Sequence, residues 1–174
     1  MKNYAKLIRD VPDFPKPGIV FKDITTLIKN GKAFKEVIEI FHKKVKHKKI
    51  DLVLAIESRG FIFGGALANK LKVGFVPVRK PGKLPWAVEQ ESYSLEYGQD
   101  TLQIHKDAVK KGQKVLIIDD LLATGGTLQA TCRLVEKLRG KVAGILVLIE
   151  LSFLKGQDKL KNYDFFSLIK YDSE

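Results

Sequence analysis

The sequence has one cysteine, one methionine and one tryptophan among its 174 residues. A single cysteine, Cys132, cannot form an internal disulfide, so a reducing cytoplasm is the expected setting. The apolar runs 52–56 and 115–118 fall far short of the roughly 20 residues that span a bilayer. The N-terminus has no apolar signal core either, so we expect neither a membrane helix nor a secretory peptide. No spacing of histidine, cysteine and aspartate is typical of a structural zinc site.

Acidic residues are scarce compared with basic ones. Lysine and arginine number 31 against 20 aspartates and glutamates, which gives a net charge of +11. Such an excess suits an anionic partner, whether nucleic acid, a membrane surface or a phosphorylated small molecule. Many lysines fall in 42–49, which is typical of the solvated end of a helix, where the dipole favours cations. No aromatic residues interleave with them, so nucleic-acid binding is not favoured.

Length and composition are those of one folded domain. An apolar fraction of 45% argues against disorder, and 174 residues suffice for a single core. The two stretches rich in proline and glycine, 11–18 and 79–85, are too short to link domains. The first is expected to be a stiff extended segment or turn, because its prolines cannot continue a helix. We therefore expect one domain over 1–174.

Hydrophobic patterning predicts strands that alternate with helices. Apolar residues at helical spacing indicate helices, and short apolar runs indicate strands. The expected helices cover 34–45, 60–71 and 127–138, and the expected strands cover 52–56, 73–78, 92–97, 101–105, 115–118, 142–151 and 165–169. This order favours an α/β fold with a parallel-sheet core and helices on both faces. Ligands of such sheets bind beyond the carboxyl ends of the strands.

The strongest motif follows the strand at 115–118. Two adjacent carboxylates, Asp119 and Asp120, come at the exit of that strand, and a loop of small residues then leads into a helix. Loop amides at a helix N-terminus suit a phosphate monoester, and the carboxylates suit sugar hydroxyls or a divalent metal. The alternative is a helix cap with two solvated aspartates. The loop residues are Ala123, Thr124, Gly125, Gly126 and Thr127.

This run resembles the motif that binds phosphoribosyl diphosphate (PRPP) in type I phosphoribosyltransferases, and its ending is similar to that of the adenine-specific members. Other segments agree with the same family in the same order. The resemblance therefore covers nearly the whole chain, and it implies the type I fold with an N-terminal hood, 1–30, over the base. The matching segments are 11–25 (base-covering), 57–61 (diphosphate loop), 78–85 and 93–98 (mobile catalytic loop) and 151–171 (tail).

The resemblance implies a purine-salvage enzyme. Its reaction would convert adenine and PRPP to AMP and diphosphate through an oxocarbenium-like transition state. It also implies Mg²⁺, held mainly by substrate oxygens and water rather than by protein ligands, and a homodimer without nucleic-acid or membrane partners. Two alternatives stay open: a transferase for hypoxanthine or guanine, and a PRPP-binding regulator with this fold.

The resemblance also assigns roles to residues. The loop 123–127 takes the 5′-phosphate, and Asp119 and Asp120 take the ribose hydroxyls. Glu96 is expected to manage the N7 proton of adenine as a general acid, which a raised pKa would suit. A cross-strand ion pair with a lysine is the alternative for Glu96. Tyr97 is either a shield of the site or a core aromatic, and Cys132 is expected to be a buried, inert thiol.

Two further groups of residues complete the expected site. Arg59 begins a helix, where the dipole disfavours a cation, so its position points to function. For the basic loop residues the alternative is a solvated charge, and for Phe21 it is ordinary core filling. Lys22 stands where the family commonly has arginine, and Gln157 likewise replaces an arginine of the tail. The expected diphosphate contacts are Ser58, Arg59, Arg79, Lys80 and Lys83, and the expected adenine contacts are Val20, Phe21 and Lys22.

Overall fold

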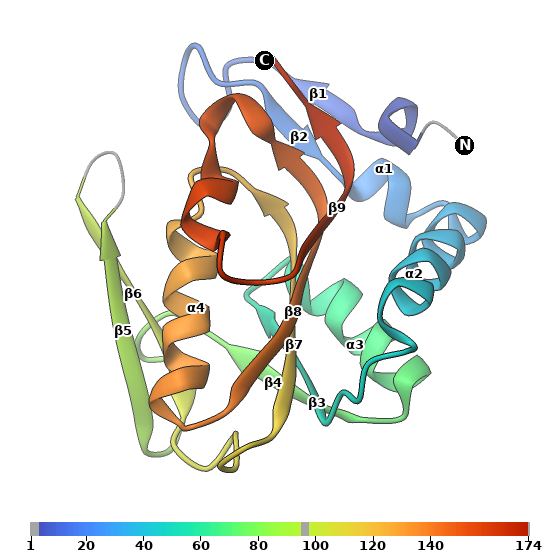
Figure 1. Cartoon of the computed structure of the whole chain (residues 1–174). Helices are drawn as coiled ribbons and strands as arrows, with labels where there is room; N and C mark the ends of the chain where they lie inside the picture. The colour runs from blue at the N-terminus through green and yellow to red at the C-terminus, as the bar shows by residue number, and fades with distance from the viewer. Residues whose placement is uncertain (1–3, 95–97, 174) are drawn as a thin grey trace.

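The computed structural model describes residues 4–94 and 98–173. At its centre lies a five-stranded sheet in which neighbouring strands pair in parallel (Figure 1). The predicted parallel core is confirmed. In spatial order its strands are β4 (Gly74–Val78), β3 (Leu52–Ile56), β7 (Lys114–Leu122), β8 (Lys141–Leu151) and β9 (Phe165–Tyr171).

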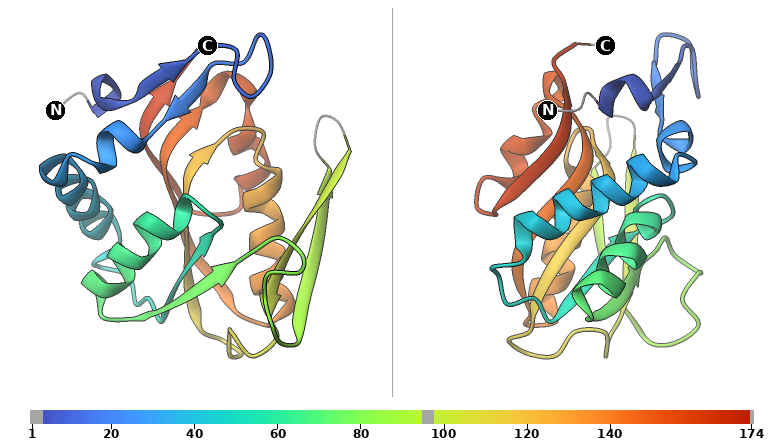
Figure 2. Two further views of the ribbon diagram at one scale, coloured as in Figure 1. Left: turned by 180° about the vertical axis from the view of Figure 1, so that it is seen from behind. Right: turned by 90° about the vertical axis from the view of Figure 1, so that its right-hand side faces the viewer.

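Alternation along the central strands sends apolar side chains to both faces of the sheet. Val53 and Leu116 pack with helices α2 (Gly31–Val45) and α3 (Gly60–Leu71) on one face. Leu54 and Ile117 pack on the other face with α4 (Gly126–Lys137) and an antiparallel ribbon of β5 (Val88–Ser94) and β6 (Gln99–His105). Figures 1 and 2 show the two covers on opposite sides of the sheet. The sequence predicted helices on both faces, but on this second face the sheet is covered by one helix and the ribbon. No helix among the described residues could cross a membrane.

A small N-terminal unit sits over the carboxyl edge of the sheet (Figure 2). It contains a 3-10 turn η1 (Tyr4–Leu7), the antiparallel pair β1 (Arg9–Val11) and β2 (Phe21–Asp23), and a short helix α1 (Thr25–Ile28). The Lys22 ammonium lies 4.4 Å from the centre of the Tyr171 ring, which ties this unit to the end of β9. This is the hood that the resemblance implied. Two 3-10 turns of the tail, η2 (Ser152–Leu154) and η3 (Gly156–Leu160), connect β8 toward β9.

The boundaries of several elements differ from the predicted ones. β7 runs four residues past the predicted end at 118, because β8 continues to pair with it up to Leu122 opposite Glu150. Asp119 and Asp120 therefore lie within the strand rather than beyond its exit. The helix α2 begins at Gly31 rather than at 34, since the Asn30 side chain caps it by accepting from the Ala33 amide at 3.1 Å.

Two expectations outside the site are also decided. Cys132 is fully buried on α4, so the prediction of a buried thiol is confirmed, and burial raises the pKa of that thiol to about 12, which favours an inert group. The 42–49 run forms the last turn of α2 and the turn after it, with most of its cations exposed. Lys48 is the exception, because its ammonium donates to the Ala143 carbonyl at 2.6 Å and pairs with Asp164.

Candidate active site

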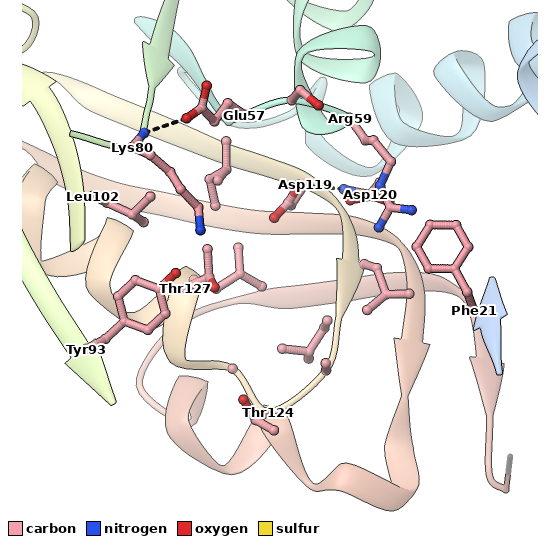
Figure 3. A pocket seen from close by; sticks show the side chains of 17 residues that line it. Phe21, Glu57, Arg59, Lys80, Tyr93, Leu102, Asp119, Asp120, Thr124 and Thr127 are labelled. Atoms are coloured by element: carbon pink, nitrogen blue, oxygen red, sulfur yellow. Dashed lines mark hydrogen bonds and ion pairs between the residues drawn. The ribbon is translucent and has the colours of Figure 1, made fainter. Parts of the chain in front are cut away.

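A cavity of about 440 Å³ opens where β3 and β7 end (Figure 3). The hood contributes one residue to its wall and the ribbon contributes two, so segments far apart in the sequence meet there. This is the carboxyl edge of the sheet, where the sequence predicted a ligand site. Ten of the predicted residues line it: Phe21, Ser58, Arg59, Lys80, Asp119, Asp120, Ala123, Thr124, Gly125 and Thr127.

The loop between β7 and α4 is held by a close backbone contact. Gly125 caps α4 with φ of 80°, a left-handed conformation that suits glycine. A Cβ atom on Gly125 would lie 2.4 Å from the Gly156 carbonyl oxygen. A Cβ atom on Gly156 would lie 2.0 Å from the Ala123 carbonyl oxygen. The tail turn therefore fixes this loop, and sequence reasoning missed Gly156 because nothing local marks a contact across 30 residues.

The two aspartates are buried, with 9% exposure for Asp119 and 5% for Asp120. The Asp120 amide donates to Asp119 Oδ1 at 2.9 Å. Burial, together with the adjacent Asp120 charge, raises the pKa of Asp119 well above its usual value. Burial also raises the pKa of Asp120, although the Arg59 charge opposes that shift. The alternative of two solvated aspartates is wrong.

Arg59 lies between the aspartates and the hood. Its Nε atom is 2.8 Å from Asp120 Oδ2, and its guanidinium carbon is 4.8 Å from the centre of the Phe21 ring. Figure 3 shows Arg59 and Phe21 at one end of the cavity and Lys80 and Tyr93 at the other. Neither Arg59 Nη1 nor Asp120 Oδ2 has an aligned hydrogen bond among the described residues, although both are buried. The ion pair already engages Asp120 Oδ2, so the hydrogen-bonding capacity left for a ligand is that of Arg59 Nη1.

Glu57 binds three residues of the basic loop that follows β4. Its carboxylate accepts from the Lys80 amide at 2.6 Å and from Arg79 Nε at 3.0 Å, and it lies 3.3 Å from Lys83 Nζ. Burial alone would raise the pKa of Glu57, but these hydrogen bonds outweigh burial and lower it. Arg79 and Lys83 do not line the cavity themselves. Sequence reasoning missed Glu57, although it opens the segment 57–61 that carried the diphosphate-loop resemblance.

A second carboxylate binds the cation that does face the cavity. Lys80 Nζ donates to Asp100 Oδ2, and the Tyr93 hydroxyl donates to the same oxygen at 3.2 Å. Tyr93 and Asp100 face each other across the ribbon. Thr127, on the first turn of α4, lies beside Tyr93 as well (Figure 3). These residues join the basic loop, the ribbon and the helix at one end of the cavity.

Some predicted residues lie elsewhere. Val20 and Gly126 do not line the cavity, and Gly126 forms the first residue of α4. Lys22 does not line it either: its side chain is 4% exposed and pairs with Asp10 at 2.9 Å. Glu96 and Tyr97 lie outside the described residues, so their predicted roles stay predictions.

Comparisons with known proteins agree on one family. The family model described as "Phosphoribosyl transferase domain" matches residues 23–172. The adenine phosphoribosyltransferase of Caldanaerobacter subterraneus is 58% identical over 171 residues, covering 98% of this chain and 99% of that protein. The one from Christiangramia forsetii is 55% identical over 171 residues, covering 98% of each chain.

Solved structures give the same result. The adenine phosphoribosyltransferase of Thermoanaerobacter pseudethanolicus superposes with a TM-score of 0.93 at 57% identity, covering 95% of this chain and 96% of that one. The Saccharomyces cerevisiae enzyme, solved with an imino-altritol bisphosphate and adenine, gives a TM-score of 0.89 at 41% identity, covering 95% and 98%. The chain therefore has the same fold as these two solved enzymes, which are both adenine phosphoribosyltransferases.

Proposed function

The chain belongs to the adenine phosphoribosyltransferase family, within the type I phosphoribosyltransferases, and we propose that its cavity holds PRPP and adenine in line to form AMP and diphosphate. One observation carries the proposal. A small-residue loop at a helix N-terminus, two buried aspartates, a cation and an aromatic ring all line the same cavity. Most of the catalytic gain then comes from positioning and from fixed charges, since the protein needs no covalent step.

The 5′-phosphate binds at the loop 123–127. Amides at the start of α4, with the hydroxyls of Thr124 and Thr127, suit a phosphate dianion. Asp119 and Asp120 accept from the ribose hydroxyls, and their position in β7 puts them directly before that loop. When positive charge develops on the ribose C1, it favours the ionised aspartates, and the low dielectric of the buried site strengthens the attraction.

The diphosphate binds at the basic side chains of the cavity. Lys80 and Ser58 line the cavity, and Glu57 holds Arg79 and Lys83 beside Lys80. Arginine and lysine suit this task because their hydrogen bonds to phosphate oxygens are charge-assisted. We also assign Arg59 to the diphosphate, with a side chain that reaches from Asp120 to Phe21 and so touches the base end too.

The donor set fits a magnesium ion held mostly by its substrate. Among the described residues no three histidine, cysteine, aspartate or glutamate side chains gather as a metal site. Mg²⁺ bound with phosphates needs only one or two protein carboxylates and keeps several waters. Asp120 Oδ2, which is buried and pairs with Arg59 at 2.8 Å, would supply one such oxygen through water. When bound, Mg²⁺ neutralises charge on the departing diphosphate.

Adenine lies under the hood. Phe21 lines the cavity and packs on the ring, while the backbone of Val20 and Lys22 reads the base edge. The side chain of Lys22 is engaged with Asp10 and Tyr171, so only its backbone is available for this role. Glu96, which follows β5 in the sequence, manages the N7 proton: it takes that proton as adenine N9 bonds to the ribose C1 and diphosphate leaves, and it returns the proton as the general acid in the reverse reaction.

The decisive experiment supplies PRPP, Mg²⁺ and each purine in turn and measures the release of diphosphate. We expect rapid release with adenine and far slower release with hypoxanthine or guanine. Release with hypoxanthine but not with adenine would overturn the substrate assignment. Tight PRPP binding without any turnover would favour a regulator with this fold.

The role of Glu96 is tested by its own variants. We expect Glu96→Gln and Glu96→Ala to lower kcat by about 10²-fold, the ordinary gain from general acid–base catalysis. Both variants should still bind PRPP, because the phosphate loop and the aspartates are untouched. If kcat of both stays within about twofold of the parent, another group handles the proton of the base.

The enzyme acts as a homodimer in the cytoplasm. Ile62 on α3 and Phe75 on β4 are large apolar side chains with 39% and 38% exposure, and β4 is the edge strand of the sheet. The Phe75 ring also packs edge-on against Phe61 at 5.7 Å, so the apolar surface continues across both elements. Exposed apolar surface of this kind favours association with a second copy. The single reduced, buried Cys132 fits a reducing compartment.

A further inference from the structure

Each basic side chain assigned to the diphosphate is already bound to a carboxylate. A diphosphate ion entering the cavity therefore meets cations that protein carboxylates already hold. A firmly fixed, buried carboxylate positions its cation, whereas a more exposed one can compete with diphosphate for it. The pairs are Arg59 with Asp120, Arg79 and Lys83 with Glu57, and Lys80 with Asp100.

The Lys80–Asp100 pair differs from the others. The Asp120 and Glu57 side chains are 7% and 6% exposed, whereas that of Asp100 is 20% exposed. The Lys80 side chain is 52% exposed and is the only one of the three loop cations that lines the cavity. Its ammonium lies beside Tyr93 and Thr127 (Figure 3). This is the pair that solvent and an entering anion can reach most easily.

The hydrogen bonds of Asp100 hold it where it opposes an anion at Lys80. Its Oδ1 atom accepts from the Thr101 amide at 2.8 Å, and its Oδ2 atom accepts from Tyr93 and from Lys80. Its partner Lys80 has a raised pKa, chiefly because of the hydrogen bond to Asp100. The ammonium therefore stays charged, and only its choice of anionic partner changes.

We propose that Asp100 competes with diphosphate for Lys80. Asp100 pairs with the Lys80 ammonium when no diphosphate is bound and must release that ammonium when diphosphate binds, so Asp100 weakens diphosphate binding. Asp100 is thus a positioning residue that acts through Lys80. The inference rests on the proposed function of this cavity. For a transferase, weaker binding of diphosphate eases release of that product, which would otherwise remain at a dense group of cations.

The test compares Asp100→Asn with a matched control, Asp107→Asn. Both variants remove one negative charge, but Asp100 lies at the Lys80 ammonium whereas Asp107 is exposed in the turn after β6. Asparagine keeps an oxygen for the Thr101 amide, so the ribbon is retained. Calorimetric titration with magnesium diphosphate measures affinity directly. Kinetics then give diphosphate inhibition and the KM of each substrate.

We expect Asp100→Asn to bind diphosphate about two- to fivefold more tightly than Asp107→Asn, the range for releasing one partly exposed ion pair. The KM for adenine should stay unchanged. Asp100→Glu, which restores the charge, should bind within about twofold of the parent. In a Lys80→Met background, Asp100→Asn should no longer tighten diphosphate binding, because the ammonium for which Asp100 and diphosphate compete is absent.

Three results would overturn the inference. Equal affinities of the Asp100→Asn and Asp107→Asn variants would mean that Asp100 does not compete. Weaker binding by Asp100→Asn would mean that Asp100 holds Lys80 in its productive position. Tightening that persists without Lys80 would assign the effect to the general field of the cavity. If the parent enzyme itself binds no diphosphate, the proposed function is wrong, and this inference, which rests on it, is wrong as well.

Discussion

Substituting Gly156 by alanine tests how the phosphate loop is positioned. Gly156 is buried in the tail turn, outside the cavity, and touches no part of the proposed substrates. The added Cβ atom would lie 2.0 Å from the Ala123 carbonyl oxygen and 2.9 Å from the Gly125 amide nitrogen. Cβ atoms essentially never approach another atom closer than 3.0 Å, and the groups in the way are backbone. The loop and the turn must therefore move apart by roughly 1 Å or more.

A displacement of that size has a calculable consequence. Misplacing a bound group by about 1 Å can lower the rate about 10²-fold, which corresponds to roughly 2.7 kcal/mol of transition-state stabilisation. Overpacking adds a loss of about 1–3 kcal/mol in the free energy of unfolding. We expect the Gly156→Ala variant to remain folded but to lose about 10²-fold in kcat/KM for PRPP, with the KM for adenine nearly unchanged.

The assay combines steady-state kinetics, thermal melting and binding of ribose 5-phosphate, which carries the phosphate without base or diphosphate. The control is Gly65→Ala on α3, because a Cβ atom there meets nothing within 4 Å. A kcat/KM for PRPP within about threefold of the parent would refute the reasoning. So would an equal loss for both substrates, since that pattern reports general damage rather than a displaced loop.

Three further predictions concern charge and association. Asp119→Asn should abolish activity yet raise the free energy of unfolding at pH 7.5 by about 1–3 kcal/mol, because it removes a buried charge. Folding raises the pKa of Asp119, so the parent loses stability as pH rises above about 4, and denaturant titrations should show the advantage of the variant shrinking toward pH 4. Glu57→Gln should raise the KM for PRPP about tenfold, because it weakens the charge-assisted hydrogen bond to Arg79, and an unchanged KM would contradict this role. Ile62→Asp should halve the mass seen by light scattering, because a charge would enter the proposed interface, whereas Asp107→Asn should leave the mass unchanged.

Local patterns allowed much of the fold to be predicted. The helix 60–71 was predicted with the bounds that the structure has, since its apolar and small residues form one continuous segment. The loop 123–127 was predicted because every part of it is contiguous in the sequence. The hairpin β1–β2 was missed, because strands of three residues are too short to show a period of two.

Long-range contacts explain what sequence reasoning could not supply. The resemblance assigned Lys80 to the diphosphate, but its protein partner Asp100 lies 20 residues further along the chain, on β6. The position of Arg59 against Phe21 likewise depends on where the hood folds over the sheet. Gly156 shows the same limit, since only the folded chain brings its carbonyl oxygen against Gly125. A sequence pattern names the residues of a site more readily than their partners.

The burial of Cys132 makes this chain suitable for site-specific fluorescent labelling. Its thiol has no exposed surface and a pKa of about 12, so maleimide reagents at neutral pH should leave it unmodified in the folded state. A cysteine introduced at the exposed Gln99, at the start of β6, would then take up a single fluorophore without any need to remove the native one. Changes in emission from that dye would follow the ribbon during turnover, in an otherwise unaltered enzyme.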